Sequence, residues 1–345
     1  MIINMSWKQN WLLILALLLV TPAGLYATTT SQQETSCPVC SNVFSATVWS
    51  TTNTFGGQDR DFLARARGTQ TILIDPITCS NCLYSGFHGD FDKDIKISED
   101  IKTRILKEKV LRPCLEIKKE DGSNDIMAWV KYDLIAQTYQ LHGKDSRQIP
   151  HIYLMASWAV RLSTSRSKVR DDNLSTKIDD FIKNNWQPAK DEPGKNDALE
   201  EIENGKKFYQ LAQLLEGEKK LIASFAAISL LREHGENTMV LQILNAIKEL
   251  MPPKQYEPLQ KLIADSIVQE RHFQNKAASL FEEIIKDEKN NQEKAALNYL
   301  CGELYRRQEH WDKARDFYRI ASEIKECPEI IAQYIKEQLK LLPEK

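Results

Sequence analysis

The sequence predicts a mainly helical protein in which a small β module precedes a group of helices and a helical-repeat solenoid. Three observations support this fold class. Glycine and proline are sparse, at 13 and 12 of 345 residues, which favours helices over a β-sandwich. Two C-x-x-C motifs lie near the N-terminus, and a pattern with a spacing of about 38 residues recurs in the C-terminal part. The length is enough for about two domains.

Residues 1–27 are typical of a secretory signal peptide. Lys8 precedes an apolar run from Trp11 to Val20, and a zone of small residues follows up to Ala27. The alternative is a membrane anchor, because residues 11–27 reach the short limit of a membrane span. We therefore expect an exported protein of the periplasm or cell envelope, with membrane contact only if this segment remains uncleaved.

The rest of the chain divides by composition into five parts. We expect a polar linker at 28–36, a zinc-ribbon-like module at 37–97, a helical domain at 98–186, a second linker at 187–196 and helical repeats at 197–345. Within them, β-branched and aromatic residues predict short strands at 47–49 and 71–74. Ser98 is a good N-cap for a helix that ends by Pro113, and further helices are predicted near 125–142, 151–166 and 173–186.

The repeats are marked by three histidines, His234, His272 and His310, each expected in the turn between two paired helices. The last unit places small and large residues where a tetratricopeptide repeat has them, namely at Gly302, Tyr305, Trp311, Ala314, Tyr318 and Ala321. Three such units should stack, with residues 328–342 as a capping helix. A solenoid of this kind offers a groove to a protein or peptide partner.

The two C-x-x-C motifs supply Cys37, Cys40, Cys79 and Cys82. Four thiolates from two tight turns suit a tetrahedral structural zinc, and the metal would contribute much of the folding free energy of a module with little core. Disulfides within each motif are the alternative in an oxidising compartment, and a redox-active dithiol is a third possibility. The other three cysteines are isolated, and Cys301 is expected in the core; these are Cys114, Cys301 and Cys327.

Several functional classes are disfavoured. The chain has 46 basic and 48 acidic residues, a net charge of −2 that argues against nucleic-acid binding. It contains no G-x-S-x-G, H-E-x-x-H, P-loop or G-x-G-x-x-G motif. The acidic run at 90–94 lacks the glycine and glutamate of a calcium loop, since Ile95 and Ile101 stand there. The sequence thus favours a non-catalytic binding or scaffold protein; the alternative is a thiol oxidoreductase or other enzyme of the envelope that uses the paired cysteine motifs.

Several stretches together resemble a bacterial family of uncharacterised proteins known only as a domain of unknown function. They are C-P-V-C at 37–40, C-S-N-C-L-Y at 79–84, the acidic–aromatic pairs at 61–62 and 90–91, the helix at 155–162 and G-E-L-Y-R-R at 302–307. The resemblance extends from about Cys37 to about Lys325. It implies the architecture described above and no activity. The chain departs from the pattern at Leu83 and Ser41, where a glycine would allow a positive φ beside the metal.

Overall fold

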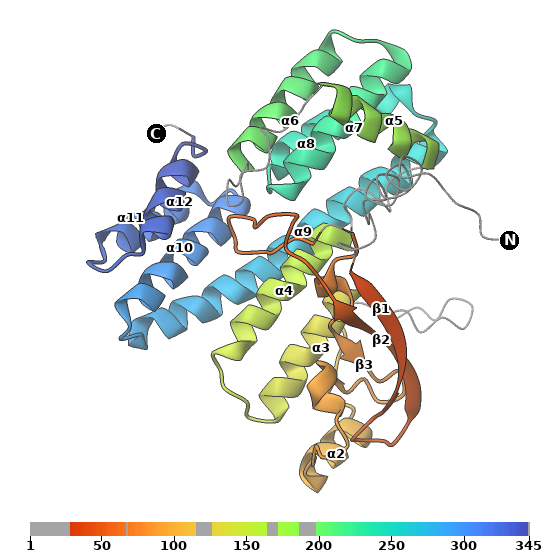
Figure 1. The fold of residues 1–345 in the computed structure, drawn as a ribbon, viewed down its shortest axis with the longest axis vertical. Coiled ribbons are helices and arrows are strands. Elements are labelled where there is room, and N and C mark those ends of the chain that lie inside the picture. The colour runs from red at the N-terminus through yellow and green to blue at the C-terminus, as the bar shows by residue number, and fades with distance from the viewer. Residues whose placement is uncertain (1–27, 67, 115–125, 164–171, 186–197, 344–345) are drawn as a thin grey trace, which may run out of the picture.

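The computed structural model describes residues 28–66, 68–114, 126–163, 172–185 and 198–343. The predicted signal peptide and the predicted linker at 187–196 lie outside these ranges. Among the described residues, no helix is both long and apolar enough to cross a membrane. Within them the predicted fold class is confirmed, since a small N-terminal β module is followed by helices (Figure 1).

The β module contains two short antiparallel sheets of two strands each. β1 (Thr29–Ser36) pairs with β2 (Val43–Thr51), and β3 (Ile77–Thr78) pairs with β4 (Ser85–Gly86). The expectation of an irregular linker at 28–36 is therefore wrong. These polar residues are compatible with a strand because β1 is almost entirely exposed to solvent, and β2 supplies its backbone hydrogen-bond partners.

The predicted strand at 71–74 is also wrong, because the chain forms a 3-10 helix, η1 (Thr71–Leu73). In the described part of the chain, no strand pairs with this segment. Its backbone bonds are local instead, with the amide of Ile74 donating to the carbonyl of Thr71 at 2.7 Å. Tyr132 on α3 also binds this segment, because its hydroxyl donates a hydrogen bond to the carbonyl of Ile72 at 3.0 Å.

The remaining described elements are helical. They are η2 (His88–Phe91), α2 (Glu99–Leu106), α3 (Ala128–Leu141), α4 (Gln148–Ser163), α5 (Asp172–Asn185), α6 (Ala198–Gln213), α7 (Gly217–Glu233), α8 (Asn237–Ala246), η3 (Lys248–Leu250), α9 (Pro253–Asp287), α10 (Asn291–Arg307), α11 (Trp311–Glu323) and α12 (Glu329–Leu339). The three helices predicted in the middle of the chain are confirmed as α3, α4 and α5. The N-cap of α2 is also confirmed, since the side chain of Ser98 accepts a hydrogen bond from the amide of Ile101.

The repeat prediction holds for the last unit and fails for the middle one. α10 and α11 form the expected helix pair, and at Gly302 a Cβ atom would come within 2.6 Å of the Tyr318 ring. His234 and His310 lie in turns, as predicted, and α12 follows as the capping helix. His272, however, lies inside the continuous 35-residue helix α9. No glycine or proline interrupts α9 after Pro258, so the chain has no local signal to turn there.

α9 connects two apolar cores of the helical body (Figure 1). Its N-terminal half places Leu259, Ile263 and Ile267 among the buried residues of α6–α8. Its C-terminal half places Phe273 and Phe281 in a second core with α3, α4 and α10–α12. A third core lies under the β module and includes residues of α2 and α3. The β module is thus packed onto the helices and shares a core with them.

Candidate metal centre and buried charge network

The four cysteines of the C-x-x-C motifs lie in two turns of nearly identical backbone geometry. In the first turn, between β1 and β2, the amide of Cys37 donates to the carbonyl of Asn42, and the amide of Ser41 donates to the carbonyl of Cys37, both at 2.9 Å. In the second, between β3 and β4, Cys79 makes the same two bonds with Tyr84 and Leu83, again at 2.9 Å. Each hairpin therefore presents two thiols from its tip.

The two tips meet and bring all four sulfur atoms together. The Sγ atoms of Cys37 and Cys82 are 3.5 Å apart, those of Cys40 and Cys79 are 3.6 Å apart, and all four lie within 4.8 Å of one another. Ligands about 2.3 Å from a tetrahedral zinc would be separated by ~3.8 Å. The cluster therefore has the donors and the size of a four-thiolate metal site. We call these four residues the cysteine cluster.

The backbone next to each hairpin tip adopts a left-handed conformation. Ser41 has φ = 58° and Leu83 has φ = 65°, although neither is glycine. These are the two positions where the sequence departs from the expected pattern. A residue with a side chain pays about 1–2 kcal/mol to adopt this conformation. Both turns thus keep a left-handed residue beside the cysteines, although neither has the glycine that favours this conformation most.

The four thiols of the cysteine cluster shift one another's pKa values. Interaction with the neighbouring Cys79 thiol raises the pKa of the Cys37 thiol to about 12. Interactions with the Cys37 and Cys82 thiols lower the pKa of the Cys79 thiol to about 2. One thiolate is thus stabilised by neighbours that keep their protons, because several negative sulfurs at this distance repel one another. A divalent cation would offset that repulsion and allow all four to ionise.

The structure bears on several sequence predictions about the cysteines and the acidic run at 90–94. None of the seven cysteines is in a disulfide, so the within-motif disulfides are not present in the structure. Cys301 is fully buried in the helical core, as predicted. In the acidic run, Asp90 bonds to Lys144 and to Tyr139, both at 2.7 Å. Among the described residues, the cysteine cluster is the group of side chains found suited to holding a metal ion.

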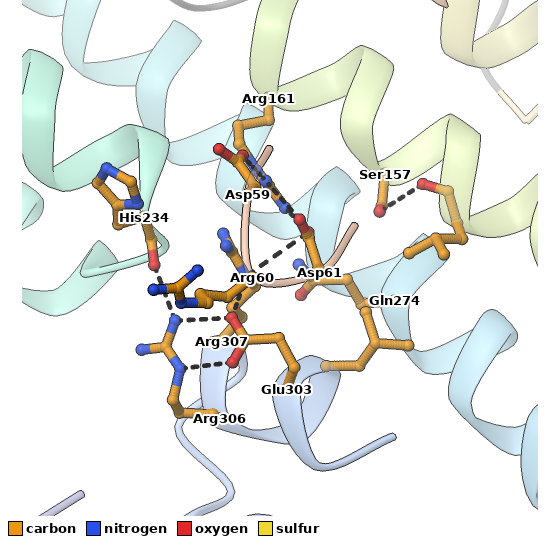
Figure 2. Close-up of polar contacts among 12 residues, drawn as sticks. Asp59, Arg60, Asp61, Ser157, Arg161, His234, Gln274, Glu303, Arg306 and Arg307 are labelled. Atoms are coloured by element: carbon orange, nitrogen blue, oxygen red, sulfur yellow. Dashed lines mark hydrogen bonds and ion pairs between the residues drawn. The ribbon is translucent and has the colours of Figure 1, made fainter. Parts of the chain in front are cut away.

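A second polar centre lies inside the helical body, where no sequence motif predicted one (Figure 2). It contains four arginines and four carboxylates, each at most 4% exposed. We call this set the buried charge network; its members are Asp59, Asp61, Arg161, Arg232, Glu270, Glu303, Arg306 and Arg307. The formal charges of these eight side chains cancel, and Arg65 at the edge of the network also pairs with Asp59 at 2.7 Å.

Arg161 on α4 is the central cation of the network. Its guanidinium donates to Asp59 at 3.0 Å and to Glu270 at 2.9 Å, and it also pairs with Asp61. Glu270 on α9 in turn pairs with Arg232 on α7. One buried arginine thus joins the loop after β2 to two helices, and through Glu270 to a third.

Glu303 on α10 is the central carboxylate of the network. It accepts hydrogen bonds from Arg307 at 2.7 Å and from Arg306 at 3.0 Å (Figure 2), and a further one from the hydroxyl of Tyr318 at 2.9 Å. Arg306 also donates to the backbone carbonyl of His234 at 3.0 Å, which ties α10 to the turn after α7. Arg307 also lies 3.5 Å from Asp61, and this ion pair joins the Glu303 half of the network to the Arg161 half.

The carboxylates of the network are held in the ionised form. Burial opposes the ionisation of Asp61, but Arg161 and Arg307 outweigh it and keep its pKa below the ordinary value. Burial likewise opposes the ionisation of Glu303, and Arg306 and Arg307 keep its pKa low. Carboxylates so strongly paired are poor proton acceptors near neutral pH. The network is therefore a structural element of the fold.

The loop between β2 and η1 carries the β module into this network. Asp59 and Asp61 are buried in it, and Arg60 between them pairs with Glu337 on α12 and lies 4.1 Å from the ring centre of Tyr334. Sequence reasoning selected the pair at 61–62, the helix at 155–162 and the stretch 302–307 only by resemblance. The structure shows that all three contribute to one site. The sequence did contain a signal for this site. Arg161 lies within the apolar stretch 156–162, and an arginine that is buried there needs a buried partner of opposite charge.

Comparison with known proteins gives a family and nothing more specific. A model for a family described as an uncharacterised protein conserved in bacteria (DUF2225) matches residues 30–250. No curated protein and no solved structure matches the chain. The matched region contains the whole cysteine cluster, together with Asp59, Asp61, Arg161 and Arg232 of the buried charge network. The chain belongs to this family of uncharacterised bacterial proteins.

Proposed function

We propose that the protein is a non-catalytic binding or scaffold protein of the cell envelope, in which the cysteine cluster holds a structural zinc ion and the helical body presents a surface to a protein or peptide partner. The observation that carries the proposal is the donor set of the cluster. Four thiols complete a tetrahedral shell, so no coordination position remains for a substrate or a reactive water. Catalytic zinc sites keep such a position open.

The buried charge network supports the same conclusion. Its cations and carboxylates pair with one another, and arginines keep the pKa of Glu303 low, so this group of buried titratable side chains is unsuited to proton transfer. The proposed location rests on the sequence of residues 1–27. A protein or peptide partner is favoured over nucleic acid because the chain has no excess of positive charge.

The decisive experiment is metal analysis combined with thiol counting on the full chain purified from its native compartment. We expect one zinc per chain and four thiols that become reactive only after a chelator removes the metal. The variant Cys79→Ser should lose zinc, whereas Cys301→Ser, at a buried cysteine outside the cluster, should retain it. A metal-free native protein with two disulfides would overturn the zinc assignment, and turnover of a model disulfide would overturn the non-catalytic one.

The binding role is tested separately by cross-linking in envelope fractions. Exposed apolar side chains on the last two helices, such as Ile320 and Ile330, are candidates for partner contact. We expect the full chain to capture a reproducible partner, and Ile330→Asp to reduce that capture if this face is used. Val268→Asp, at an exposed position on α9, is the matched control. Absence of any reproducible partner would count against the role.

A further inference from the structure

We propose that the cysteine cluster, when emptied of metal and exposed to a peroxide, oxidises to two disulfides that cross between the hairpins, Cys37–Cys82 and Cys40–Cys79. The within-motif pairs expected from sequence spacing would not form. The inference concerns the same residues as the proposed function, but it rests on the sulfur geometry alone. Its test reads disulfide connectivity and does not require that zinc bind.

The contacts between sulfurs carry this inference. The hydrogen-bonding sulfur pairs in the structure are Cys37 with Cys82 at 3.5 Å and Cys40 with Cys79 at 3.6 Å. A disulfide needs sulfurs about 2.05 Å apart, so each crossed pair must close by about 1.5 Å. Both partners sit on hairpin tips that already face each other. Closure therefore requires a small approach of the two tips and leaves the backbone bonds within each turn in place.

Exposure gives each crossed pair one reactive and one resolving sulfur. Cys40 and Cys82 are partly exposed, whereas Cys37 and Cys79 are at most 2% exposed. Each crossed pair joins one exposed sulfur to one buried sulfur of the opposite hairpin. A peroxide in solvent therefore meets Cys40 or Cys82 first, and the sulfur in contact with it lies behind, in the protein interior.

The chemistry balances for each pair separately. The exposed thiol attacks one oxygen of hydrogen peroxide, the O–O bond breaks, and a sulfenic acid and one water form. The buried thiol then attacks the sulfenic sulfur, the S–O bond breaks, and the disulfide and a second water form. Two thiols and one peroxide thus give one disulfide and two waters. With both pairs oxidised no thiolate remains, so the cluster can no longer hold a metal.

Crossed disulfides would also maintain the module. Cys37 and Cys82 are 45 residues apart, and Cys40 and Cys79 are 39 apart, so each bond joins one hairpin to the other. A within-motif disulfide would close only a single turn and leave the hairpins unconnected. The proposed oxidation therefore exchanges a metal cross-link for a covalent one at the same place. The loop that carries Asp59 and Asp61 into the buried charge network lies between the two hairpins and would remain enclosed.

Peptide mapping tests the proposal directly, because trypsin separates the two motifs. The sequence has no lysine or arginine between Lys8 and Arg60, or between Arg67 and Lys93. Cys37 and Cys40 thus lie in one peptide, and Cys79 and Cys82 in another. The full chain, reduced, metal-depleted and treated with stoichiometric hydrogen peroxide, should yield these peptides as one linked species. Separate peptides, each containing an internal disulfide, would overturn the proposal.

Double variants distinguish the two possible crossed patterns. The chain with Cys37→Ser and Cys82→Ser retains Cys40 and Cys79, which are in contact. The matched chain with Cys37→Ser and Cys79→Ser retains Cys40 and Cys82. We expect the first to form its cross-link at least tenfold faster, measured by the mass of the linked tryptic species. Equal rates, or a faster second chain, would refute the assigned pairing. If a variant fails to fold, the map of the unaltered chain still decides between crossed and within-motif disulfides.

Zinc content is a separate readout. If zinc binds, loading the protein with it should slow the oxidation at least tenfold, and a colorimetric chelator should detect zinc release in step with the appearance of the linked peptides. If no zinc binds, the proposed function fails, while the crossed connectivity is still confirmed or refuted by the peptide map. Zinc release that accompanies separate, internally oxidised peptides would overturn only the crossed pairing.

Discussion

Replacing Arg161 with methionine should strongly destabilise the helical body. The guanidinium is fully buried and pairs with Asp59, Asp61 and Glu270. Methionine fills a similar volume without charge, so the main effect is that three buried carboxylates lose their shared cation. Removing one partner of a buried ion pair typically costs about 3–5 kcal/mol. Because whole proteins are stable by about 5–15 kcal/mol, this loss is about a fifth of the total or more.

Urea unfolding followed by far-ultraviolet circular dichroism measures this loss. For a slope of about 3 kcal/mol per molar, the midpoint should fall by about 1–2 M. Arg319→Met is the matched control, because Arg319 pairs with Glu323 at the surface and both side chains are 61% exposed. An exposed pair of this kind contributes under about 1 kcal/mol. If Arg161→Met shifted the midpoint no more than Arg319→Met does, the network would not be the stabilising element we describe.

The pH dependence provides a second check on the same variant. Burial opposes the ionisation of Asp61 and Glu270, but arginines outweigh it and hold both pKa values below the ordinary range. A depressed carboxylate pKa contributes stability above the unfolded pKa of about 4, and this stability is lost as the pH falls through the folded pKa. The difference between the native chain and Arg161→Met should thus be largest near pH 7 and shrink below about pH 4. A difference that stayed constant from pH 7 to pH 3 would refute the electrostatic origin.

Three further predictions concern the hairpin tips and the last helix pair. Ser41→Gly should tighten metal binding by about 1 kcal/mol, measured by competition with a chelator, because glycine adopts the positive φ of 58° without strain. Ser45→Gly, in the exposed part of β2, should instead weaken the hairpin. Equal effects of the two variants on metal affinity would refute the strain argument. Gly302→Ala should lower the melting temperature, since its Cβ would come within 2.6 Å of the Tyr318 ring and overpacking costs about 1–3 kcal/mol; an increase, as helix propensity alone predicts, would contradict the close approach. Metal removal, or Cys79→Ser, should make the β module sensitive to proteases while α10 and α11 stay protected, and uniform loss of protection would show that the module is not a separate metal-dependent unit.

Local signals in the sequence predicted the helices and the cysteine cluster, whereas long-range pairing was not visible there. The sequence placed α3, α4 and α5 close to their observed bounds and Ser98 at the N-cap of α2, and the spacing of the C-x-x-C motifs was enough to select the four cysteines that meet. The strand at 29–36 was missed because its polar residues are typical of a linker, and only the partner strand makes it regular. The turn expected at His272 was inferred from its spacing to His234 and His310, but a turn needs a breaking residue, and α9 has none there.

The buried charge network was beyond reach for a different reason. Its partners lie far apart in the chain, 100 residues for Asp61 and Arg161 and 109 residues for Arg161 and Glu270, and no local pattern encodes which charges will meet. A single sequence shows only that a charged residue, Arg161, lies in an apolar stretch. The fold determines that a carboxylate from another helix, Glu270 on α9, pairs with it.

The length of α9 has a consequence for which part of the chain can fold by itself. The family match ends at residue 250, before α9 begins, yet Arg161 and Arg232 within the matched region both pair with Glu270 beyond it. A fragment ending at residue 250 would expose the apolar faces that α9 covers over its length of about 52 Å, and would bury two arginines without their shared carboxylate. We therefore expect that residues 30–250 do not fold by themselves in this protein. The family match ends before α9, whereas contacts with the matched region continue to α12, where Glu337 pairs with Arg60.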